Sequence, residues 1–185
     1  MAAAIAQSNS LLGSFSQPLR WLFQARPISL DPNRDAQKFV DEFEVNYGHQ
    51  HPQFFIGSYQ NAVAAAFQQS KFLVVYLHSP IHDDTNRFCQ QVLCTTQFIN
   101  AMNENAVIWG GKVWDPEAYS LSGQLGASAF PFLAILMCQS NRAVQIVDRI
   151  QGYTDSEVPP LDRINTAIQL YGMTLNRNRI EVERR

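Results

Sequence analysis

Residues 71–84 read KFLVVYLHSPIHDD, an apolar run that gives way abruptly to a polar segment. The run 71–77 is short, contains β-branched residues and is apolar on both faces, which is typical of a strand at the centre of a sheet. The polar segment after it carries two histidines, a proline and two aspartates. Both the fold and the chemistry depend on this junction between a buried strand and the next helix.

The other elements are predicted from apolar spacing and turn residues. Further strands are predicted over 106–113, 132–138 and 143–150. Helices are predicted over 34–46, 59–70, 86–93 and 160–171. Thr96 is predicted to cap a further helical turn, and Asp115 and Pro116 to start a helix that ends near Gly126. Residues 49–57 are expected to form a loop.

Four residues are predicted to shape the strands. Gly110 and Gly111 predict a bulge or an end in the second strand. Gly152 is expected to end the last strand, and Pro131 stands immediately before the third. A proline at this point favours a cis peptide bond, since proline is almost the only residue for which that bond is inexpensive. A trans proline that opens the strand is the alternative.

The order of elements from residue 71 onward is β-α-β-α-β-β-α. A helix crossover makes the first two strands parallel, and the turn at residues 139–142 makes the last two antiparallel. The fold class is therefore α/β, with a mixed four-stranded sheet, helices on both faces and extra N-terminal helices. This order, with Pro131 before the third strand, resembles the thioredoxin core.

Thioredoxin chemistry needs two cysteines, two residues apart, at the start of the helix after the first strand, where the helix lowers the thiol pKa. The junction 78–84 contains no cysteine. Cys89 and Cys94 lie further along at the wrong spacing, and we interpret both as core or near-core residues. A regulatory disulfide between them and a single reactive thiol at Cys89 are the alternatives. We expect no catalytic residue, no cofactor site and no enzymatic activity.

A metal site at the junction is a further alternative. His78, His82, Asp83 and Asp84 are close in sequence, but a proline separates the histidines, unlike the helical His pair of zinc enzymes. We therefore expect a solvated polar loop and no metal. His49 and His51 form a separate pair for which the sequence offers no obvious partner.

The net charge of the chain bears on whether it binds nucleic acid. The formal net charge is −2, so no basic excess indicates nucleic acid.

Residues 1–33 are predicted to be a leader and linker, 34–173 the domain, and 174–185 a polar tail that starts a charged helix. Within the leader, residues 11–23 carry apolar side chains at roughly helical spacing, which predicts either an amphipathic membrane segment or a leader packed on the domain. No run is long and apolar enough to predict a transmembrane helix.

Several stretches together resemble the UAS domain, the thioredoxin-like domain of the FAS-associated factors, which are UBX-domain adaptors. The matching stretches, over about residues 35–175, are 39–44, Tyr47 with Gly48, His51 with Pro52, Phe55, 57–59, 73–78, Phe88 with Cys89, Leu93 with Cys94, Tyr119, 130–134 and Gly152.

The resemblance implies a non-enzymatic role. It implies a link between ubiquitin-pathway proteins and the valosin-containing AAA ATPase, in endoplasmic-reticulum-associated degradation and lipid-droplet regulation. It also implies binding of long-chain unsaturated fatty acids, self-association, and a place on the cytoplasmic face of the endoplasmic reticulum or lipid droplets, or otherwise in the cytoplasm. The ubiquitin-binding and UBX domains of the family have no counterpart in these residues, so direct recruitment of the ATPase is not assigned to them.

Overall fold

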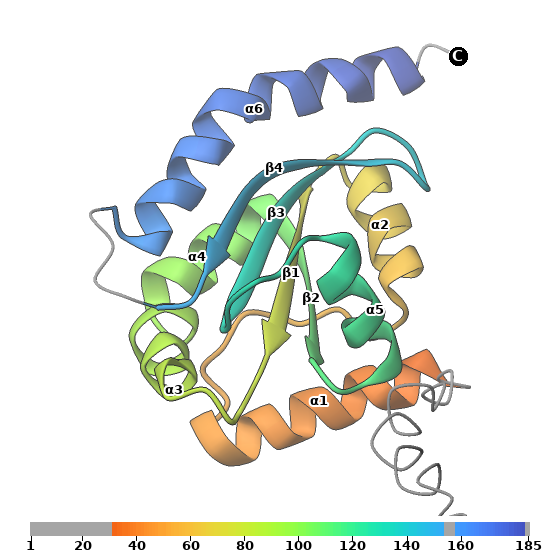
Figure 1. Ribbon diagram of the computed structural model, residues 1–185. Helices are drawn as coiled ribbons and strands as arrows, with labels where there is room; N and C mark the ends of the chain where they lie inside the picture. The colour runs from red at the N-terminus through yellow and green to blue at the C-terminus, as the bar shows by residue number, and fades with distance from the viewer. Residues whose placement is uncertain (1–30, 154–157, 184–185) are drawn as a thin grey trace, which may run out of the picture.

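A four-stranded sheet with the strand order β2-β1-β3-β4 forms the centre of the protein (Figure 1). The computed structural model describes residues 31–153 and 158–183. β1 is parallel to β2 and antiparallel to β3, and β4 is antiparallel to β3, as the crossover and the turn predict. The strands are β1 (Phe72–His78), β2 (Ala106–Lys112), β3 (Phe132–Cys138) and β4 (Val144–Gln151).

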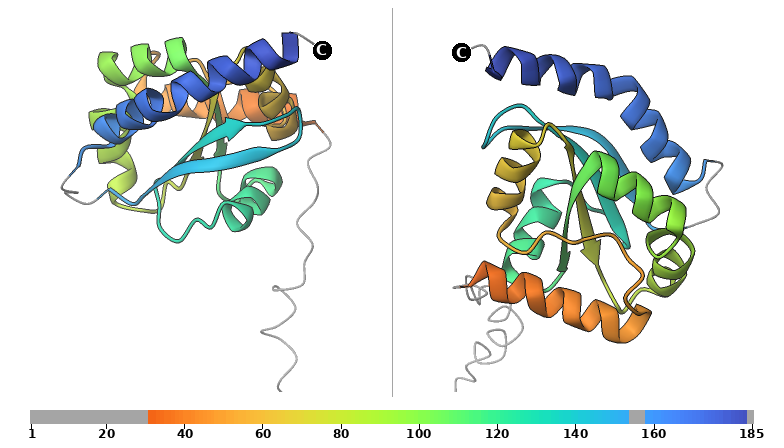
Figure 2. Two further views of the ribbon diagram at one scale, coloured as in Figure 1. Left: turned by 90° about the horizontal axis from the view of Figure 1, so that it is seen from above. Right: turned by 180° about the vertical axis from the view of Figure 1, so that it is seen from behind.

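Helices cover both faces of this sheet. They are α1 (Pro32–Tyr47), α2 (Tyr59–Gln68), α3 (Asp84–Phe88), the π-helix η1 (Cys89–Leu93), α4 (Thr96–Asn105), α5 (Pro116–Gln124) and α6 (Pro160–Glu183). Figure 2 shows α4 and α6 on one side of the sheet and α5 on the other. The core contacts place α2 on the same face of the sheet as α5, and the remaining helices on the face covered by α4 and α6. The protein therefore has the predicted mixed α/β architecture.

The alternating side chains of β1 divide the core into two halves. Phe72, Val74 and Tyr76 face α1, α3, α4 and α6, whereas Leu73 and Val75 face α2 and α5. Every residue of β1 is buried. A strand that buries both faces must be apolar throughout, which is the pattern from which the central strand was predicted.

The boundaries differ from the predictions in three instructive places. The last helix was expected to end at Tyr171 but continues to Glu183, because Leu175 is buried against the core beyond Gly172. Thr95, not Thr96, caps α4, and its hydroxyl accepts from the backbone N–H of Phe98. The helix predicted over 86–93 is an α-helical turn followed by the π-helix η1, a distinction that apolar spacing does not contain.

The structure shows no bulge at Gly110 and Gly111, and β2 ends one residue later, at Lys112. Both glycines pair regularly with β1, opposite Tyr76 and Leu77, and the observed irregularity lies in the β3–β4 pair. A Cβ atom at Gly110 would collide with the ring of Phe39. Close approach of α1 to β2 therefore explains the glycine, not strand geometry.

The prediction for residues 11–23 lies outside the described residues. Among the helices that the structure describes, none has the length and apolar character needed to cross a bilayer.

Candidate functional site

The site that sequence reasoning singled out lies at the carboxyl end of β1, where α1 passes beneath the sheet (Figure 1). The segment between β1 and α3 forms a tight turn that satisfies its own polar groups. Thr85 donates through its hydroxyl to the Ser79 carbonyl at 2.7 Å, and Ser79 Oγ lies 2.7 Å from Nδ1 of His82. Ser79 and Thr85 are buried, whereas Ile81 is exposed. A turn closed by its own hydrogen bonds, here called the closed turn, thus occupies the position that holds the redox cysteines in thioredoxins.

Pro131 lies beside this turn. The Phe130–Pro131 peptide bond is cis, and the ring of Phe130 packs on His82 with centroids 5.4 Å apart. The backbone N–H of Gly152 donates to the Pro131 carbonyl at 2.9 Å. Gly152 has a φ of +68°, a conformation that glycine adopts without steric cost, so it turns the chain away after β4.

The three cysteines are free, and none of them belongs to this turn. Cys89 begins η1, is fully buried, and its Sγ is 3.3 Å from the Tyr76 hydroxyl. Burial raises the pKa of the Cys89 thiol to about 11 and that of Cys138 to about 12, and it also raises the pKa of half-buried Cys94. A nucleophilic thiol needs the opposite shift, because the thiolate is the reactive form.

A buried polar chain connects Cys89 to the end of β1. The Tyr76 hydroxyl lies 2.8 Å from Nδ1 of His78 as well as against Cys89. Burial, and then the nearby charge of Lys112, lower the pKa of His78 to about 4. Burial raises the pKa of Tyr76 well above its ordinary value. All three groups are therefore neutral at physiological pH, and they form a hydrogen-bonded chain without a charge.

Three of the four side chains considered as metal ligands have other partners in the structure. His78 binds Tyr76, His82 binds Ser79, and Asp84 lies in α3 within 3.8 Å of Arg87. No group of three or more His, Cys, Asp or Glu side chains within residues 31–153 and 158–183 is arranged to hold a metal ion.

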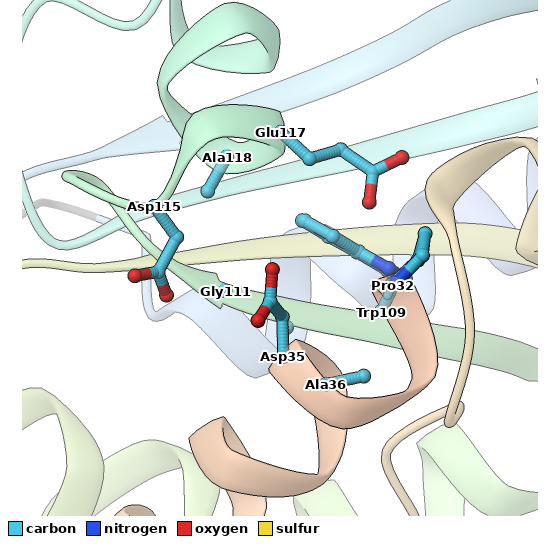
Figure 3. A pocket seen from close by; sticks show the side chains of 9 residues that line it. Pro32, Asp35, Ala36, Trp109, Gly111, Asp115, Glu117 and Ala118 are labelled. Atoms are coloured by element: carbon cyan, nitrogen blue, oxygen red, sulfur yellow. The ribbon is translucent and has the colours of Figure 1, made fainter. Parts of the chain in front are cut away.

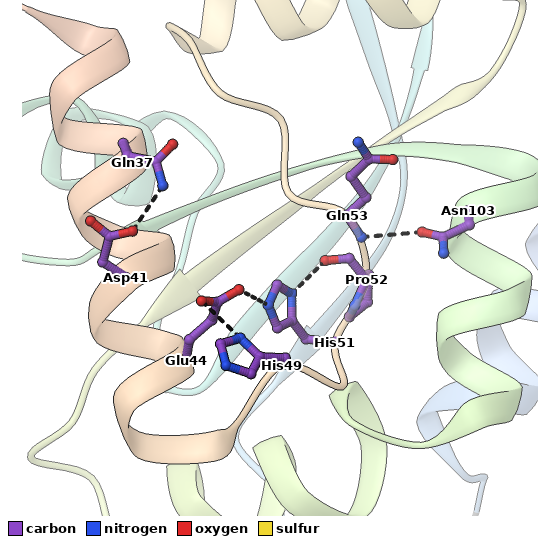
Figure 4. A network of polar contacts seen from close by, with 8 residues as sticks. All are labelled: Gln37, Asp41, Glu44, His49, His51, Pro52, Gln53 and Asn103. Atoms are coloured by element: carbon purple, nitrogen blue, oxygen red, sulfur yellow. Dashed lines mark hydrogen bonds and ion pairs between the residues drawn. The ribbon is translucent and has the colours of Figure 1, made fainter.

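The sequence offers no obvious partner for His49 and His51, but the structure gives them one. Both histidines contact Glu44 of α1, with His49 Nδ1 at 3.0 Å and His51 Nε2 at 3.2 Å (Figure 4). The other ring nitrogen of His51 lies 2.8 Å from the Pro52 carbonyl oxygen. Hydrogen bonds from the two histidines lower the pKa of Glu44, that from His51 most. The cluster joins the end of α1 to the loop that leads to α2.

Three carboxylates face a small gap between the first turns of α1 and α5 (Figure 3). They belong to Asp35, Asp115 and Glu117, and Glu117 accepts from the backbone N–H of Tyr59 at 2.9 Å. Burial raises the pKa of Asp115 and of Glu117, and the charge of Asp35 adds to both shifts. Asp115 occupies the predicted N-cap position, but its side chain makes no capping hydrogen bond.

Sequence reasoning also missed an ion pair at the junction. Lys112, the last residue of β2, donates to Glu42 of α1 at 2.6 Å, and its side chain is only 12% exposed. Lys112 is the strand neighbour of His78. The two charged residues are 70 positions apart in the chain, so no local pattern could have joined them.

Comparison with solved structures identifies the class of fold. Its structure resembles that of a thioredoxin from Thermus thermophilus, with a TM-score of 0.52 and 19% identity, covering 66% of this chain and 88% of the other. It also resembles a DsbH oxidoreductase, with a TM-score of 0.51 and 15% identity, covering 65% and 86%. At these identities the likeness establishes the thioredoxin-like fold alone.

Sequence comparison gives the family within this class. The family model of Fas-associated factor 1 matches residues 39–125. FAS-associated factor 2 of Homo sapiens is 36% identical over 135 residues, which are 73% of this chain and 29% of the relative. Plant UBX domain-containing protein 10 of Arabidopsis thaliana is 32% identical over 154 residues, which are 82% of this chain and 32% of the relative. The chain belongs to the FAS-associated factor family, and it spans less than a third of the length of these relatives.

Proposed function

We propose that this domain is a non-catalytic interaction module of an adaptor in the ubiquitin pathway. The observation that carries the proposal is the closed turn between β1 and α3, where Ser79 and His82 stand in place of a redox thiol pair. Membership of a family whose relatives include a UBX domain-containing protein supports the adaptor role. The raised pKa values of the three thiols argue against the alternative, a redox protein with a lone reactive cysteine.

The finer parts of this proposal follow from family resemblance. The module would serve an adaptor linked to the valosin-containing AAA ATPase in endoplasmic-reticulum-associated degradation and lipid-droplet regulation. Its place would be the cytoplasmic face of the endoplasmic reticulum or of lipid droplets, or otherwise the cytoplasm, with contact to the membrane through residues 11–23. Its small-molecule partners would be long-chain unsaturated fatty acids, which would promote self-association.

Fatty-acid sensing predicts a difference between two acids of the same chain length. We expect oleate to raise the light scattering of the protein at concentrations where stearate leaves it unchanged, because a sensor of unsaturation must distinguish a bent chain from a straight one. Static light scattering during parallel titrations measures the effect, and the same titrations without protein correct for micelles. Equal responses to the two acids would count against lipid sensing.

A further inference from the structure

The loop between α1 and α2 covers one edge of the sheet. β2 is an edge strand, and the loop pairs with it through a parallel bridge between Phe54 and Ile108. The backbone N–H of Phe55 donates to the Ile108 carbonyl at 2.7 Å, and the Phe54 side chain is buried in the core. An uncovered edge strand presents unpaired backbone groups to which another chain can add. The contacts that hold this loop closed therefore determine whether the edge of β2 is accessible.

His51 connects this loop to α1 and uses both of its ring nitrogens (Figure 4). Nδ1 lies 2.8 Å from the Pro52 carbonyl oxygen, and Nε2 lies 3.2 Å from Oε1 of Glu44. A carbonyl oxygen can only accept a hydrogen bond, and so can an ionised carboxylate. Because a neutral imidazole has one N–H group, it can satisfy only one of these two acceptors. The geometry therefore favours a His51 ring that carries a proton on each nitrogen.

Glu44 supplies the negative charge that such a ring needs. A glutamate ordinarily titrates near pH 4.3, and hydrogen bonds from His51 and His49 lower the pKa of this carboxyl further. Glu44 is therefore ionised at neutral pH and has no proton to donate to His51. The side chain of His51 is only 9% exposed, so a neutral ring would hold a nitrogen lone pair against a carboxylate where water has little access.

Aromatic rings and uncharged groups pack around the His51 ring. Phe43 and Phe54 contact it with ring centroids 5.4 Å away. The Phe43 ring also contacts His78 at 6.2 Å, and burial lowers the pKa of His78 to about 4, so that second imidazole is neutral at physiological pH. From α4, the uncharged side chain of Asn103 contacts the loop. These neighbours add no positive charge that would compete with a proton on His51.

We propose that His51 is a buried imidazolium that holds the loop of residues 48–58 closed against α1, and that the loop opens when this ring loses a proton. Opening exposes His51 to water, where an imidazole releases its proton near pH 6.5. The closed loop retains the proton, so its advantage is complete below that pH and declines as the pH rises above it. The inference does not rest on the proposed function, because it requires neither a lipid nor an adaptor partner.

Nitrogen-15 NMR of the imidazole rings tests the charge of His51 in the full chain. The two ring nitrogens of an imidazolium resonate close together, whereas those of a neutral ring are widely separated. At pH 7 we expect a closely spaced pair of signals for His51, assigned by its absence from the spectrum of His51→Gln. A widely separated pair would overturn the proposal in favour of a neutral ring.

Hydrogen exchange at the Phe55 amide tests the opening, because this N–H is bonded to β2 only while the loop is closed. The protection factor corrects for the pH dependence of exchange itself. We expect it to fall by up to tenfold per pH unit above about pH 6.5. His51→Gln should lower it at pH 6.5 by roughly tenfold or more, because a hydrogen bond between charged groups is lost. A protection factor that does not change with pH in the parent would overturn the proposal.

His49→Ala is the matched control, because His49 contacts the other oxygen of Glu44 at 3.0 Å but has a side chain that is 86% exposed. Its loss should change the protection factor by no more than about threefold and should preserve the pH dependence. Glu44→Gln should abolish the pH dependence with the loop still closed, because an amide can donate to the lone pair of a neutral His51. Equal losses in the two histidine variants, or a pH dependence that survives in Glu44→Gln, would contradict the role of His51.

Discussion

Replacing Gly110 with alanine is expected to lower the free energy of unfolding by about 1–3 kcal/mol, the usual cost of overpacking a filled core. The new Cβ would meet the Phe39 ring and lie 3.0 Å from Cδ1 of Phe54. Both rings are buried and pack edge to face at 5.1 Å, so neither can move aside without displacing the other. Urea denaturation of the variant and the parent measures the loss.

Gly123→Ala provides the control. A Cβ at this position has no heavy atom within 4 Å, and the residue lies in α5. Alanine in a helix is favoured over glycine by roughly 0.5–1 kcal/mol, so this variant should be neutral or slightly more stable. A double variant with Phe39→Leu should recover part of the loss, because leucine leaves space above Gly110. An unaltered stability in Gly110→Ala would show that α1 does not pack against β2 as closely as the structure has it.

Removing the Tyr76 hydroxyl is expected to have the second large effect, a loss of about 1–3 kcal/mol in Tyr76→Phe. The change leaves Nδ1 of His78 and the thiol of Cys89 without their shared partner in a buried site. Thermal and urea unfolding of the variant measure the loss. The substitution keeps the ring and its stacking on Phe88, so the hydrogen bonds account for the difference.

Tyr153→Phe removes a comparable hydroxyl from the surface. That hydroxyl donates to Gln91 at 2.9 Å in an exposed position, and its loss should change stability by no more than about 0.5 kcal/mol. Similar losses of unfolding free energy in the two tyrosine variants would mean that the buried hydrogen bonds of Tyr76 stabilise the protein no more than an ordinary surface hydrogen bond does.

The elements predicted from the sequence are those whose signal is local. β1 and β3 are buried on both faces, and their apolar runs fixed them to within a residue. Proline next to an N-cap residue marked the start of α5, and positive φ at Gly126 matches the predicted end of that helix. The parallel and antiparallel pairings followed from connection length, since a tight turn can join only antiparallel strands.

The features that could not be predicted from the sequence depend on contacts between segments far apart in the chain. Gly110 requires glycine because Phe39, on another element, fills the space above it. His51 contacts Glu44 only after the loop folds back on α1, and Lys112 contacts Glu42 only because β2 ends beside that helix. The ion pair of Lys112 with Glu42 therefore could not be predicted, although Lys112 pairs with His78 at the junction from which the prediction of the fold began.

Two features support the proposed non-catalytic role. One is the turn between β1 and α3, and the other is the uncharged hydrogen-bonded chain of Cys89, Tyr76 and His78. A helix N-terminus and a cis-proline remain at the edge where thioredoxins hold their thiols, but the thiols of this chain lie in or near its core. We propose that this domain binds a partner at that edge.

The rate of thiol alkylation as a function of pH tests this account most directly. Short pulses of iodoacetamide on the folded protein, read by mass spectrometry at each cysteine, are compared with the same reaction in urea. Because burial raises the pKa of all three thiols, each folded-state rate should lie below its urea value and still be rising at pH 9. A cysteine that reaches half of its maximal rate near neutral pH would contradict the central claim and make the protein a candidate redox enzyme.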